Sequence, residues 1–340
     1  MTGILISEGA GSMEITRRDL LKTFAAIGAG LTVAGCSGTA VREGTSKEVK
    51  ERVVGAIKAR ASNTPVIWLQ GQSCAGCSVS LLNSVHPDIA EVLTQTINLE
   101  FHSNVMAAAG DKALSMFERA ISNQRGEFVL VAEGSFPTGS GGNFCAIGER
   151  DGKPITSLEW VQRLGGAAKA TLAVGACAAY GGIPAANGSP TGAKPFSGVI
   201  PNAAFINIPG CPAHPDWIVG TIGHVLLFGI PELDEYKRPK MFFSKTVHDN
   251  CERRSYFDSG IFAEDYSGEG CLIGLGCKGP ESYCDAPIRG WNNHVNWCAR
   301  SGGPCIGCTQ PTFPDHHQGL YARLPQERIE ELAGKPILFA

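Results

Sequence analysis

The sequence predicts an α/β fold, a parallel sheet covered by helices on both faces, followed by a small irregular domain rich in cysteine. Four short apolar runs, at residues 65–70, 128–132, 170–175 and 203–208, have the length and composition of buried parallel strands. Segments of helical character separate these runs. From about Leu233 onward the long apolar runs stop and cysteines become frequent, which indicates a second domain of a different kind.

Composition limits the possible classes of protein. The chain has 340 residues, 43% of them hydrophobic and 18% charged, which is enough for two domains with real cores. A formal net charge of −3 leaves no basic surplus, so nucleic acid is excluded as a partner. The 43 glycines and 20 prolines predict many loops, and the 13 cysteines are the candidates for holding those loops in place.

Residues 1–40 are predicted to be an export leader. Thr16-Arg17-Arg18-Asp19-Leu20-Leu21-Lys22 precedes a short apolar stretch at 24–34, which is typical of a twin-arginine signal. That route exports proteins in the folded state. Outside this leader, no apolar run in the sequence reaches the roughly 18–20 residues of a membrane-spanning helix.

Two cleavage sites remain open in this leader. Val33-Ala34-Gly35-Cys36 has the form of a lipobox, in which Cys36 would carry a lipid that tethers the protein to a membrane. Gly38-Thr39-Ala40 fits release of a soluble protein. In either case the polar stretch 41–64 is expected to be a linker or a short surface helix.

Cysteines stand where the predicted strands end. Cys74 and Cys77 follow the first strand, Cys177 follows the third and Cys211 follows the fourth. Because the carboxyl ends of parallel strands meet at one edge of a sheet, we expect these four thiols to lie together. Four converging thiolates predict a cubane iron–sulfur cluster. Disulfides are chemically possible in an exported protein, but the two-residue spacing favours a metal chelate. The helix that follows Cys77 is expected to continue to about Leu93.

The cysteine-rich second half has too little apolar sequence for an ordinary core, so metal sites or disulfides must stabilise it. A histidine alone is usually structural. His248, however, precedes Cys251 by three residues, and without it this segment has one ligand too few for two four-ligand sites, so we interpret it as a ligand. A zinc ribbon is disfavoured because only Cys305-Ile306-Gly307-Cys308 has the paired spacing. Two four-ligand sites can be drawn from His248, Cys251, Cys271, Cys277, Cys284, Cys298, Cys305 and Cys308.

In this order the motifs resemble the small subunit of nickel–iron hydrogenases. The resemblance covers about residues 65–315 and rests on Cys74-x-x-Cys77, Gly175-Ala176-Cys177-Ala178-Ala179-Tyr180-Gly181-Gly182, Pro209-Gly210-Cys211-Pro212, His248-x-x-Cys251, Cys271-x5-Cys277-Lys278-Gly279-Pro280 and Cys305-x-x-Cys308. It implies a flavodoxin-like doubly wound domain over 65–232, an iron–sulfur domain over 233–318 and a tail over 319–340. It also implies an obligate heterodimer whose large subunit holds the nickel–iron site, so no catalytic residue is expected on this chain.

The resemblance also implies a role for each ligand. Three clusters would carry electrons from hydrogen oxidation on the large subunit to the surface of this chain. The proximal cluster would be held by Cys74, Cys77, Cys177 and Cys211, the medial one by Cys284, Cys298, Cys305 and Cys308, and the distal one by His248, Cys251, Cys271 and Cys277.

The medial set departs from the common pattern of the family. Most relatives have a proline where this chain has Cys298, and they hold a three-iron cluster. Four thiolates here predict a four-iron (4Fe-4S) cluster, as in the nickel–iron–selenium branch, which Trp68-Leu69-Gln70-Gly71-Gln72 also resembles. A three-iron cluster is expected instead if Cys298 does not bind iron.

The expected acceptor is a multihaem cytochrome c that docks near His248, in the periplasm or on the outer face of the cytoplasmic membrane. A stand-alone exported ferredoxin-like carrier and a disulfide-stapled binding protein are the alternatives. Cys145 is expected to be a buried free thiol. Glu133, at a strand end, either assists proton or charge balance near the proximal site or is an exposed carboxylate without a role.

Overall fold

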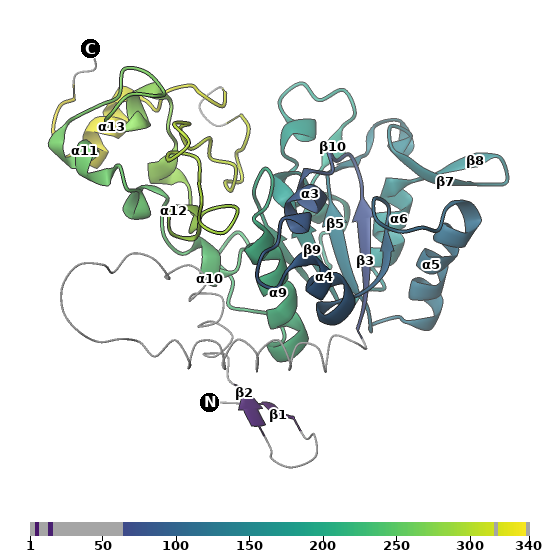
Figure 1. The fold of residues 1–340 in the computed structure, drawn as a ribbon. Helices are drawn as coiled ribbons and strands as arrows, with labels where there is room; N and C mark the ends of the chain where they lie inside the picture. The colour runs from purple at the N-terminus through teal and green to yellow at the C-terminus, as the bar shows by residue number, and fades with distance from the viewer. Residues whose placement is uncertain (1–3, 7–12, 16–63, 316–318, 338–340) are drawn as a thin grey trace.

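The computed structural model describes residues 4–6, 13–15, 64–315 and 319–337. They form a sheet-containing part and a cysteine-rich C-terminal part, which lie side by side (Figure 1). The predicted signal, both cleavage sites and most of the linker lie outside the described residues. Near the N-terminus, β1 (Ile4–Ile6) and β2 (Met13–Ile15) pair as antiparallel strands.

A five-stranded parallel sheet is the centre of the first part. Its strands are β3 (Pro65–Gln70), β4 (Asn98–His102), β5 (Val129–Glu133), β9 (Ala170–Val174) and β11 (Phe205–Ile208). They lie in the order β4-β3-β5-β9-β11, and every neighbouring pair is parallel. Numbered along the chain this order is 2-1-3-4-5, the flavodoxin-like arrangement, so the predicted fold class is confirmed.

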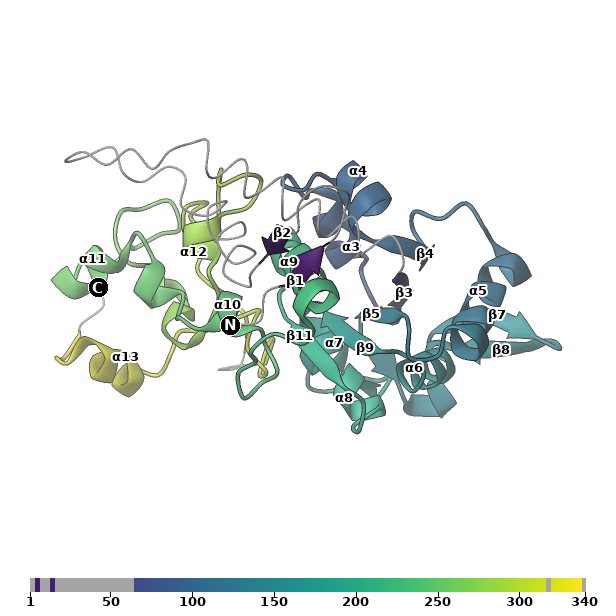
Figure 2. The ribbon, with the colours of Figure 1, turned by 90° about the horizontal axis from the view of Figure 1, so that it is seen from below.

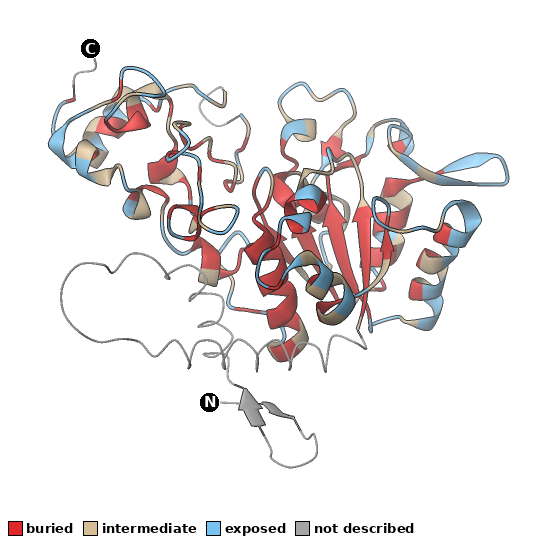
Figure 3. Cartoon of the chain, in the orientation of Figure 1, coloured by how far each residue is buried: buried red, intermediate tan, exposed pale blue. Residues whose placement is uncertain are grey.

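Each central strand contributes side chains to two cores. Val66 and Trp68 face one cluster of buried residues, whereas Ile67 and Leu69 face the other. Because both faces are covered, these strands are mostly apolar and almost completely buried (Figure 3), with Gln70 at the end of β3 half-buried. The edge strand β4 was missed from the sequence because its first residues, Asn98-Leu99-Glu100, are polar or only half-buried.

Four helices cover the sheet. On one face lie α3 (Gly76–Leu82) and α9 (Pro215–Phe228), and on the other α5 (Gly110–Asn123) and α6 (Ser157–Gly165) (Figure 2). The α9 helix is buried along nearly its whole length because the sheet packs on one side of it and the C-terminal part on the other.

The helix after Cys77 is shorter than the sequence predicted. It ends at Leu82, and after Pro87 the chain forms a new short helix, α4 (Ile89–Glu91), which continues as the π-helical segment η1 (Val92–Thr96). Proline disfavours helical backbone at the residue before it, and Asp88 begins the new helix with a capping box to Glu91. The apolar pattern to Leu93 therefore belongs to two helical pieces rather than one.

The other elements of this part are short and connect the strands to the sheet edges. They are β6 (Phe136–Pro137), η2 (Gly139–Gly142), β7 (Ala146–Arg150), β8 (Lys153–Thr156), α7 (Gly175–Tyr180), η3 (Ile183–Ala185), β10 (Ala193–Lys194) and α8 (Phe196–Val199).

Short helical turns and loops make up the C-terminal part. Its elements are α10 (Lys240–Phe243), η4 (His248–Asn250), α11 (Arg254–Ser259), η5 (Leu272–Leu275), η6 (Gly279–Glu281), α12 (Ala286–Arg289) and α13 (Gln326–Ala333). Within the described ranges, no helix has the length and apolar character needed to cross a membrane.

The segment 319–337, for which the sequence offered no account, packs onto this C-terminal part. Leu324, Ile329 and Ile337 are buried in a small separate core with Phe257 and Ile273. Arg328 on α13 also forms an ion pair with Glu281, at 3.1 Å. The segment is therefore part of the folded structure.

Candidate metal centres

The first thiol set lies at the carboxyl edge of the sheet. Cys74 lies on the β3–α3 connection, Cys77 lies in the first turn of α3, Cys177 lies in the first turn of α7 after β9, and Cys211 follows β11. The turn that separates the first two cysteines requires Ala75 in the left-handed region, at φ 59°. The order of the strands reverses between β3 and β5, the position where ligands bind in open sheets of this type.

Two glycines in this set leave room around the sulfurs. A Cβ atom on Gly175 would lie 2.5 Å from the Sγ of Cys77, and one on Gly182 would lie 2.9 Å from the Sγ of Cys177. Both glycines have positive φ, at 87° and 53°, which L side chains rarely adopt. The first contact also shows that the β9–α7 turn lies directly against the β3–α3 turn. Glycine at both positions therefore allows the backbone to approach the two sulfurs more closely than any other residue could.

The electrostatics of these thiols also fit a cationic group. Burial, Glu133 and the thiols of Cys177 and Cys211 raise the pKa of Cys77. Burial, followed by Cys211 and Cys74, raises the pKa of Cys177 to about 12. Each thiolate thus disfavours the others, and binding of iron, which requires deprotonated sulfur, would compensate for this repulsion.

Glu133 is the hydrogen-bond centre of this edge. Its carboxylate, only 1% exposed, accepts hydrogen bonds from five residues, including the backbone N–H of Cys77 at 3.1 Å and the Nε1 of Trp68 at 2.8 Å. The other donors are Gln70, Ser73 and Ser78, the last through both its backbone N–H and its hydroxyl. The prediction of an exposed carboxylate without a role is wrong, because the loop after β3 folds over the end of β5.

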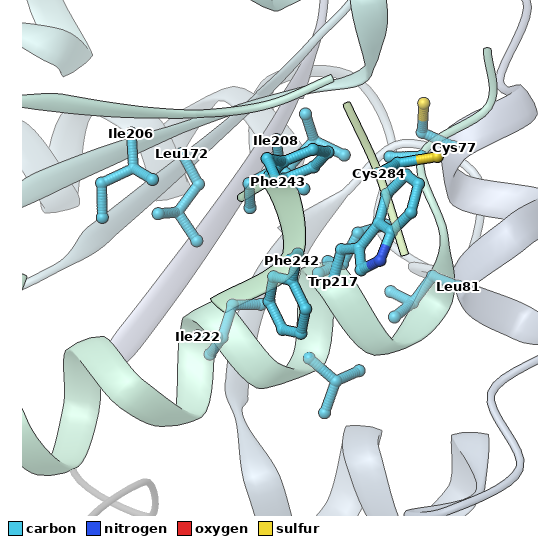
Figure 4. Close-up of a cluster of buried hydrophobic side chains, with 14 of the residues drawn as sticks. Cys77, Leu81, Leu172, Ile206, Ile208, Trp217, Ile222, Phe242, Phe243 and Cys284 are labelled. Atoms are coloured by element: carbon cyan, nitrogen blue, oxygen red, sulfur yellow. The ribbon is translucent and has the colours of Figure 1, made fainter. Parts of the chain in front are cut away.

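A second thiol set lies in the C-terminal part, next to the first. Burial and the thiols of Cys305 and Cys308 raise the pKa of Cys284, and burial with Cys305 raises that of Cys298 to about 12. Cys308 interacts electrostatically with Cys298 and Cys305, and also with Cys211 of the first set. Figure 4 shows Cys77 and Cys284 in one buried cluster with Trp217 of α9. The two sets are therefore neighbours across the junction of the two parts.

A third set lines a single cavity. His248, Cys251, Cys271 and Cys277 all contribute to its wall, together with Trp297. The Nε2 atom of His248 is buried and has no hydrogen-bond partner, so it is free to bind a metal. Burial and Arg254 lower the pKa of His248 to about 4, which keeps the imidazole in the neutral form that coordinates metals.

Backbone donors surround the sulfurs of this third set. The N–H of Arg253 donates to the Sγ of Cys251 and the N–H of Gly279 donates to the Sγ of Cys277, both at 3.4 Å. Such N–H···S bonds stabilise negative charge on sulfur and raise the potential of a bound cluster. Cys277 also interacts with Cys305 of the second set.

All twelve cysteines that the structure describes are free thiols, so the disulfide-stapled alternative has no bridge in this part of the chain. Across the same ranges, no three His, Cys, Asp or Glu side chains lie close enough to hold a single metal ion. In an iron–sulfur cluster each cysteine binds a different iron atom. The thiolates of a cluster site can therefore lie farther apart than the ligands of a single metal ion. Cys145 is only half-buried, which corrects the expectation of a buried thiol.

Sequence reasoning missed two buried cations between the sets. Arg289 of α12 forms ion pairs with Asp216 at 2.9 Å and Asp285 at 2.6 Å. The spacing of Asp285 and Arg289, four residues apart, could have suggested their pairing on a helix. Lys278, 1% exposed, lies between two cysteines of different sets, and the sequence carries no signal for its burial because lysine is usually solvated.

A flavodoxin-like sheet with thiols at its carboxyl edge, next to a cysteine-rich part, defines an iron–sulfur electron-transfer protein. Comparison with known families agrees. Residues 243–321 match the family described as the C-terminal region of the NiFe/NiFeSe hydrogenase small subunit. Residues 74–225 match the family described as NADH ubiquinone oxidoreductase, 20 Kd subunit.

Similar proteins identify the family for the whole chain. The chain is 42% identical over 325 residues to the periplasmic NiFeSe hydrogenase small subunit of Desulfomicrobium baculatum, covering 91% of this chain and 99% of the relative. It is 37% identical to the uptake hydrogenase small subunit of Azotobacter vinelandii, over 94% of this chain and 86% of the relative. A crystal structure of the reduced, active Ni-Fe-Se hydrogenase from Desulfomicrobium baculatum superposes with a TM-score of 0.73 and 44% identity, over 77% of this chain and all of the other.

The chain therefore belongs to the NiFe/NiFeSe hydrogenase small-subunit family. It is the electron-transfer subunit of a hydrogenase complex, as its sequence motifs predicted.

Proposed function

We propose that this chain relays electrons through three four-iron clusters, from hydrogen oxidation on a partner large subunit to a multihaem cytochrome c. The proximal cluster would be bound within residues 65–232 and the other two within 233–318. The single observation that carries the proposal is the order of the thiol sets. In the second set, the thiol of Cys308 interacts electrostatically with Cys211 of the first set. The thiol of Cys305, also in the second set, interacts electrostatically with Cys277 of the third. The sets thus follow one another as a wire requires.

The ligands proposed for each cluster are those of the three sets. Each cluster, when bound, supplies a one-electron carrier, and the residues around it fix its position and potential. The proximal set would use Cys74, Cys77, Cys177 and Cys211, the medial set Cys284, Cys298, Cys305 and Cys308, and the distal set His248, Cys251, Cys271 and Cys277.

The surface around the proximal set supports a large-subunit partner. Cys74 and Cys211 are exposed on this chain alone. Next to the first thiol set, Val79 and Leu82 of α3 are 55% and 44% exposed, and Ile183 of η3 is 49% exposed. Apolar side chains grouped beside exposed thiols fit a surface that another protein covers. The nickel–iron or nickel–iron–selenium site would lie on that partner.

Export and membrane attachment complete the proposal. The Desulfomicrobium baculatum relative is periplasmic by name. A twin-arginine leader, cleaved after export, would place this subunit in the periplasm, and a lipid on Cys36 would hold it at the outer face of the cytoplasmic membrane.

Substitution of Cys298 tests the cluster assignment. We expect the parent complex to contain about twelve irons on this subunit and to show four-iron EPR signals after reduction by hydrogen. In Cys298→Pro the medial set loses one thiolate, so an oxidised three-iron signal should appear and the iron count should fall by about one. Cys145→Ser, at a cysteine outside the three sets, is the matched control and should leave the spectrum unchanged. A Cys298→Pro spectrum with only four-iron signals would show that Cys298 is not a ligand.

The alternative function, a stand-alone ferredoxin-like carrier, makes a different prediction. A tagged chain would then be purified alone with its clusters and remain folded. We expect a second, nickel-containing subunit to be purified with it in equal amount.

A further inference from the structure

Lys278 is a fully buried lysine with a fixed position. Its side chain is 1% exposed, and its ammonium donates hydrogen bonds to the carbonyls of Leu320 at 2.9 Å, Ala322 at 3.1 Å and Gly276 at 3.3 Å. Burial of a charge is unfavourable unless other groups compensate for the lost hydration. Three carbonyl dipoles satisfy the three donors of the ammonium but carry no net negative charge. The buried ammonium therefore needs a negatively charged group nearby to balance its charge.

The residue lies between the second and third thiol sets. It directly follows Cys277 of the third set, and its backbone N–H donates to the carbonyl of Cys305 in the second set at 2.7 Å. The hydroxyl of Ser282 donates to the Lys278 carbonyl at 2.6 Å and fixes this turn.

The side chain of Lys278 runs along the loop that carries Cys305 and Cys308. A Cβ on Gly307, whose φ is +74°, would lie 3.5 Å from the Cδ of Lys278, so the loop and the lysine stem are in close contact. Burial raises the pKa of Cys305, whereas the Ser282 hydroxyl, the backbone at Gly307 and the nearby Lys278 charge lower it. Cys305 and Cys277 act electrostatically on the ammonium, and so does Glu281, whose carboxylate is also paired with Arg328 at 3.1 Å.

We infer that Lys278 is a fixed counter-charge shared by the medial and distal clusters, which raises the reduction potentials of both relative to the proximal cluster. This inference rests on the proposed function, because it requires clusters at the second and third sets. Reduction adds one negative charge to a cluster. A cation held nearby, in an interior that screens charge weakly, stabilises the reduced form and raises the potential.

The segment 319–337 has a place in this arrangement. Two of the three carbonyls that hold the ammonium belong to Leu320 and Ala322, at the start of the segment. The rest of the segment is fixed by the burial of Leu324 and Ile329. The start of the segment thus covers the ammonium of Lys278 and holds its charge beside the second and third thiol sets.

The experiment is an EPR-monitored redox titration of the purified hydrogenase complex, with the iron content measured for each variant. In Lys278→Gln, which retains a hydrogen-bond donor but no charge, we expect the midpoint potentials of the medial and distal clusters to shift to lower values. The proximal cluster would lie farther from Lys278 than the other two clusters. Its midpoint potential should therefore shift less and serves as the internal reference. Lys278→Arg, which keeps the charge, should retain potentials near those of the parent.

Ile329→Ala is the matched control for a purely structural role. It loosens the packing of the C-terminal segment but leaves the lysine in place, so it should lower the thermal midpoint without the selective shift in potential. An equal shift in Ile329→Ala would overturn the inference, because solvent access rather than charge would then set the potentials.

Unchanged potentials in a fully loaded Lys278→Gln complex would also overturn it. If Lys278→Gln does not retain iron, Lys278→Met is measured in its place, and loss of iron in both neutral variants contradicts a role limited to tuning. A parent complex without iron would contradict the proposed function itself, which distinguishes that failure from the others.

Discussion

At the scale of single residues, Glu133 shows how a buried carboxylate can organise a ligand loop. An ionised carboxylate only accepts hydrogen bonds, and here donors from five residues converge on it. Two of the donors are the backbone N–H groups of Cys77 and Ser78 in the first turn of α3. The carboxylate therefore fixes the position of the turn that carries two proximal thiols.

Replacement of this carboxylate tests that role. In Glu133→Gln the amide nitrogen would face at least one of the donors, and each buried donor left unpaired costs on the order of 1–3 kcal/mol. We expect a lower thermal midpoint and slower or incomplete loading of the proximal cluster, measured by calorimetry and EPR. Glu118→Gln, which weakens the largely exposed ion pairs of α5 with Arg150 and Arg163, is the control and should lower the midpoint only slightly and leave cluster loading unchanged. An unaltered midpoint in Glu133→Gln would contradict the structural role.

The three residue-level surprises have one physical cause. Glu133, Lys278 and Arg289 are charged residues that the fold buries, at 1%, 1% and 5% exposure. A sequence indicates which residue types are usually solvated, but the partners that compensate for a buried charge come from distant segments. The Glu133 donors lie on β3, on the loop after it and in the first turn of α3, and two of the Lys278 acceptors lie more than 40 residues further along the chain.

At the scale of secondary-structure elements, an ion-pair cluster joins α9 to α12. Arg289 of α12 pairs with Asp216 of α9, and the Nε1 of Trp217 on α9 donates to Asp285 at 2.7 Å. The Nε2 of His214, which precedes α9, contacts the carbonyl of Gly290 at 2.7 Å. Cys211 lies just before α9 and Cys284 just before α12, so this cluster fixes the first thiol set relative to the second.

Removal of the arginine should therefore weaken the junction of the two parts. In Arg289→Met two carboxylates, largely shielded from solvent, lose their cation, and breaking a buried ion pair costs about 3–5 kcal/mol. The expected result is a clearly lower thermal midpoint of the complex, at a fixed scan rate. Arg150→Met removes an exposed ion pair with Glu118, worth about 0.2–1 kcal/mol, and provides the comparison. Equal midpoints for the two variants would show that the junction does not depend on Arg289.

The sequence predicted the elements whose burial is uniform and missed those whose burial is mixed. The runs that became β3, β5, β9 and β11 are apolar because both faces are covered. By contrast, β4 is an edge strand. Because its first residues are polar or half-buried, the sequence there lacks the continuous apolar run that indicates a buried strand. The helix expected to reach Leu93 is interrupted near Pro87, a residue that could have signalled the break. The grouping of the first thiol set was predictable because the strand ends place its four cysteines at one edge of the sheet.

At the scale of the whole molecule, the thiol sets lie along a path from the sheet edge through the junction into the C-terminal part. The exposed Cys74 and Cys211 mark one end of this path. The cavity that contains His248 marks the other. Between them Cys284 and Cys305 are buried and Cys308 is half-buried, which limits the solvent reorganisation that accompanies electron transfer, whereas Cys298 is exposed. A wire of this kind depends on the stability of the fold as a whole.

Buried histidines make that stability depend on pH. Burial lowers the pKa of His102, at the end of β4, and of His214, before α9, below the ordinary value of 6.5. In the unfolded chain both imidazoles take up protons as the pH falls through about 6.5, whereas the folded protein resists this uptake. The unfolded state then binds more protons, so the free energy of unfolding decreases with falling pH. Stability from these two residues is fully present above pH 6.5 and is lost below it.

The measurement is the thermal midpoint of the complex between pH 7.5 and 5, in which we expect a progressive decrease below about pH 6.5. His102→Gln removes one of the two buried titrating groups and should make the decrease less steep, even though it also lowers the midpoint at pH 7.5 by removing the contact with Ser78. His86→Gln changes an exposed histidine and should leave the slope as it is in the parent. A slope for His102→Gln as steep as that of the parent would show that acid destabilisation arises elsewhere, for instance from protonation of the cluster thiolates.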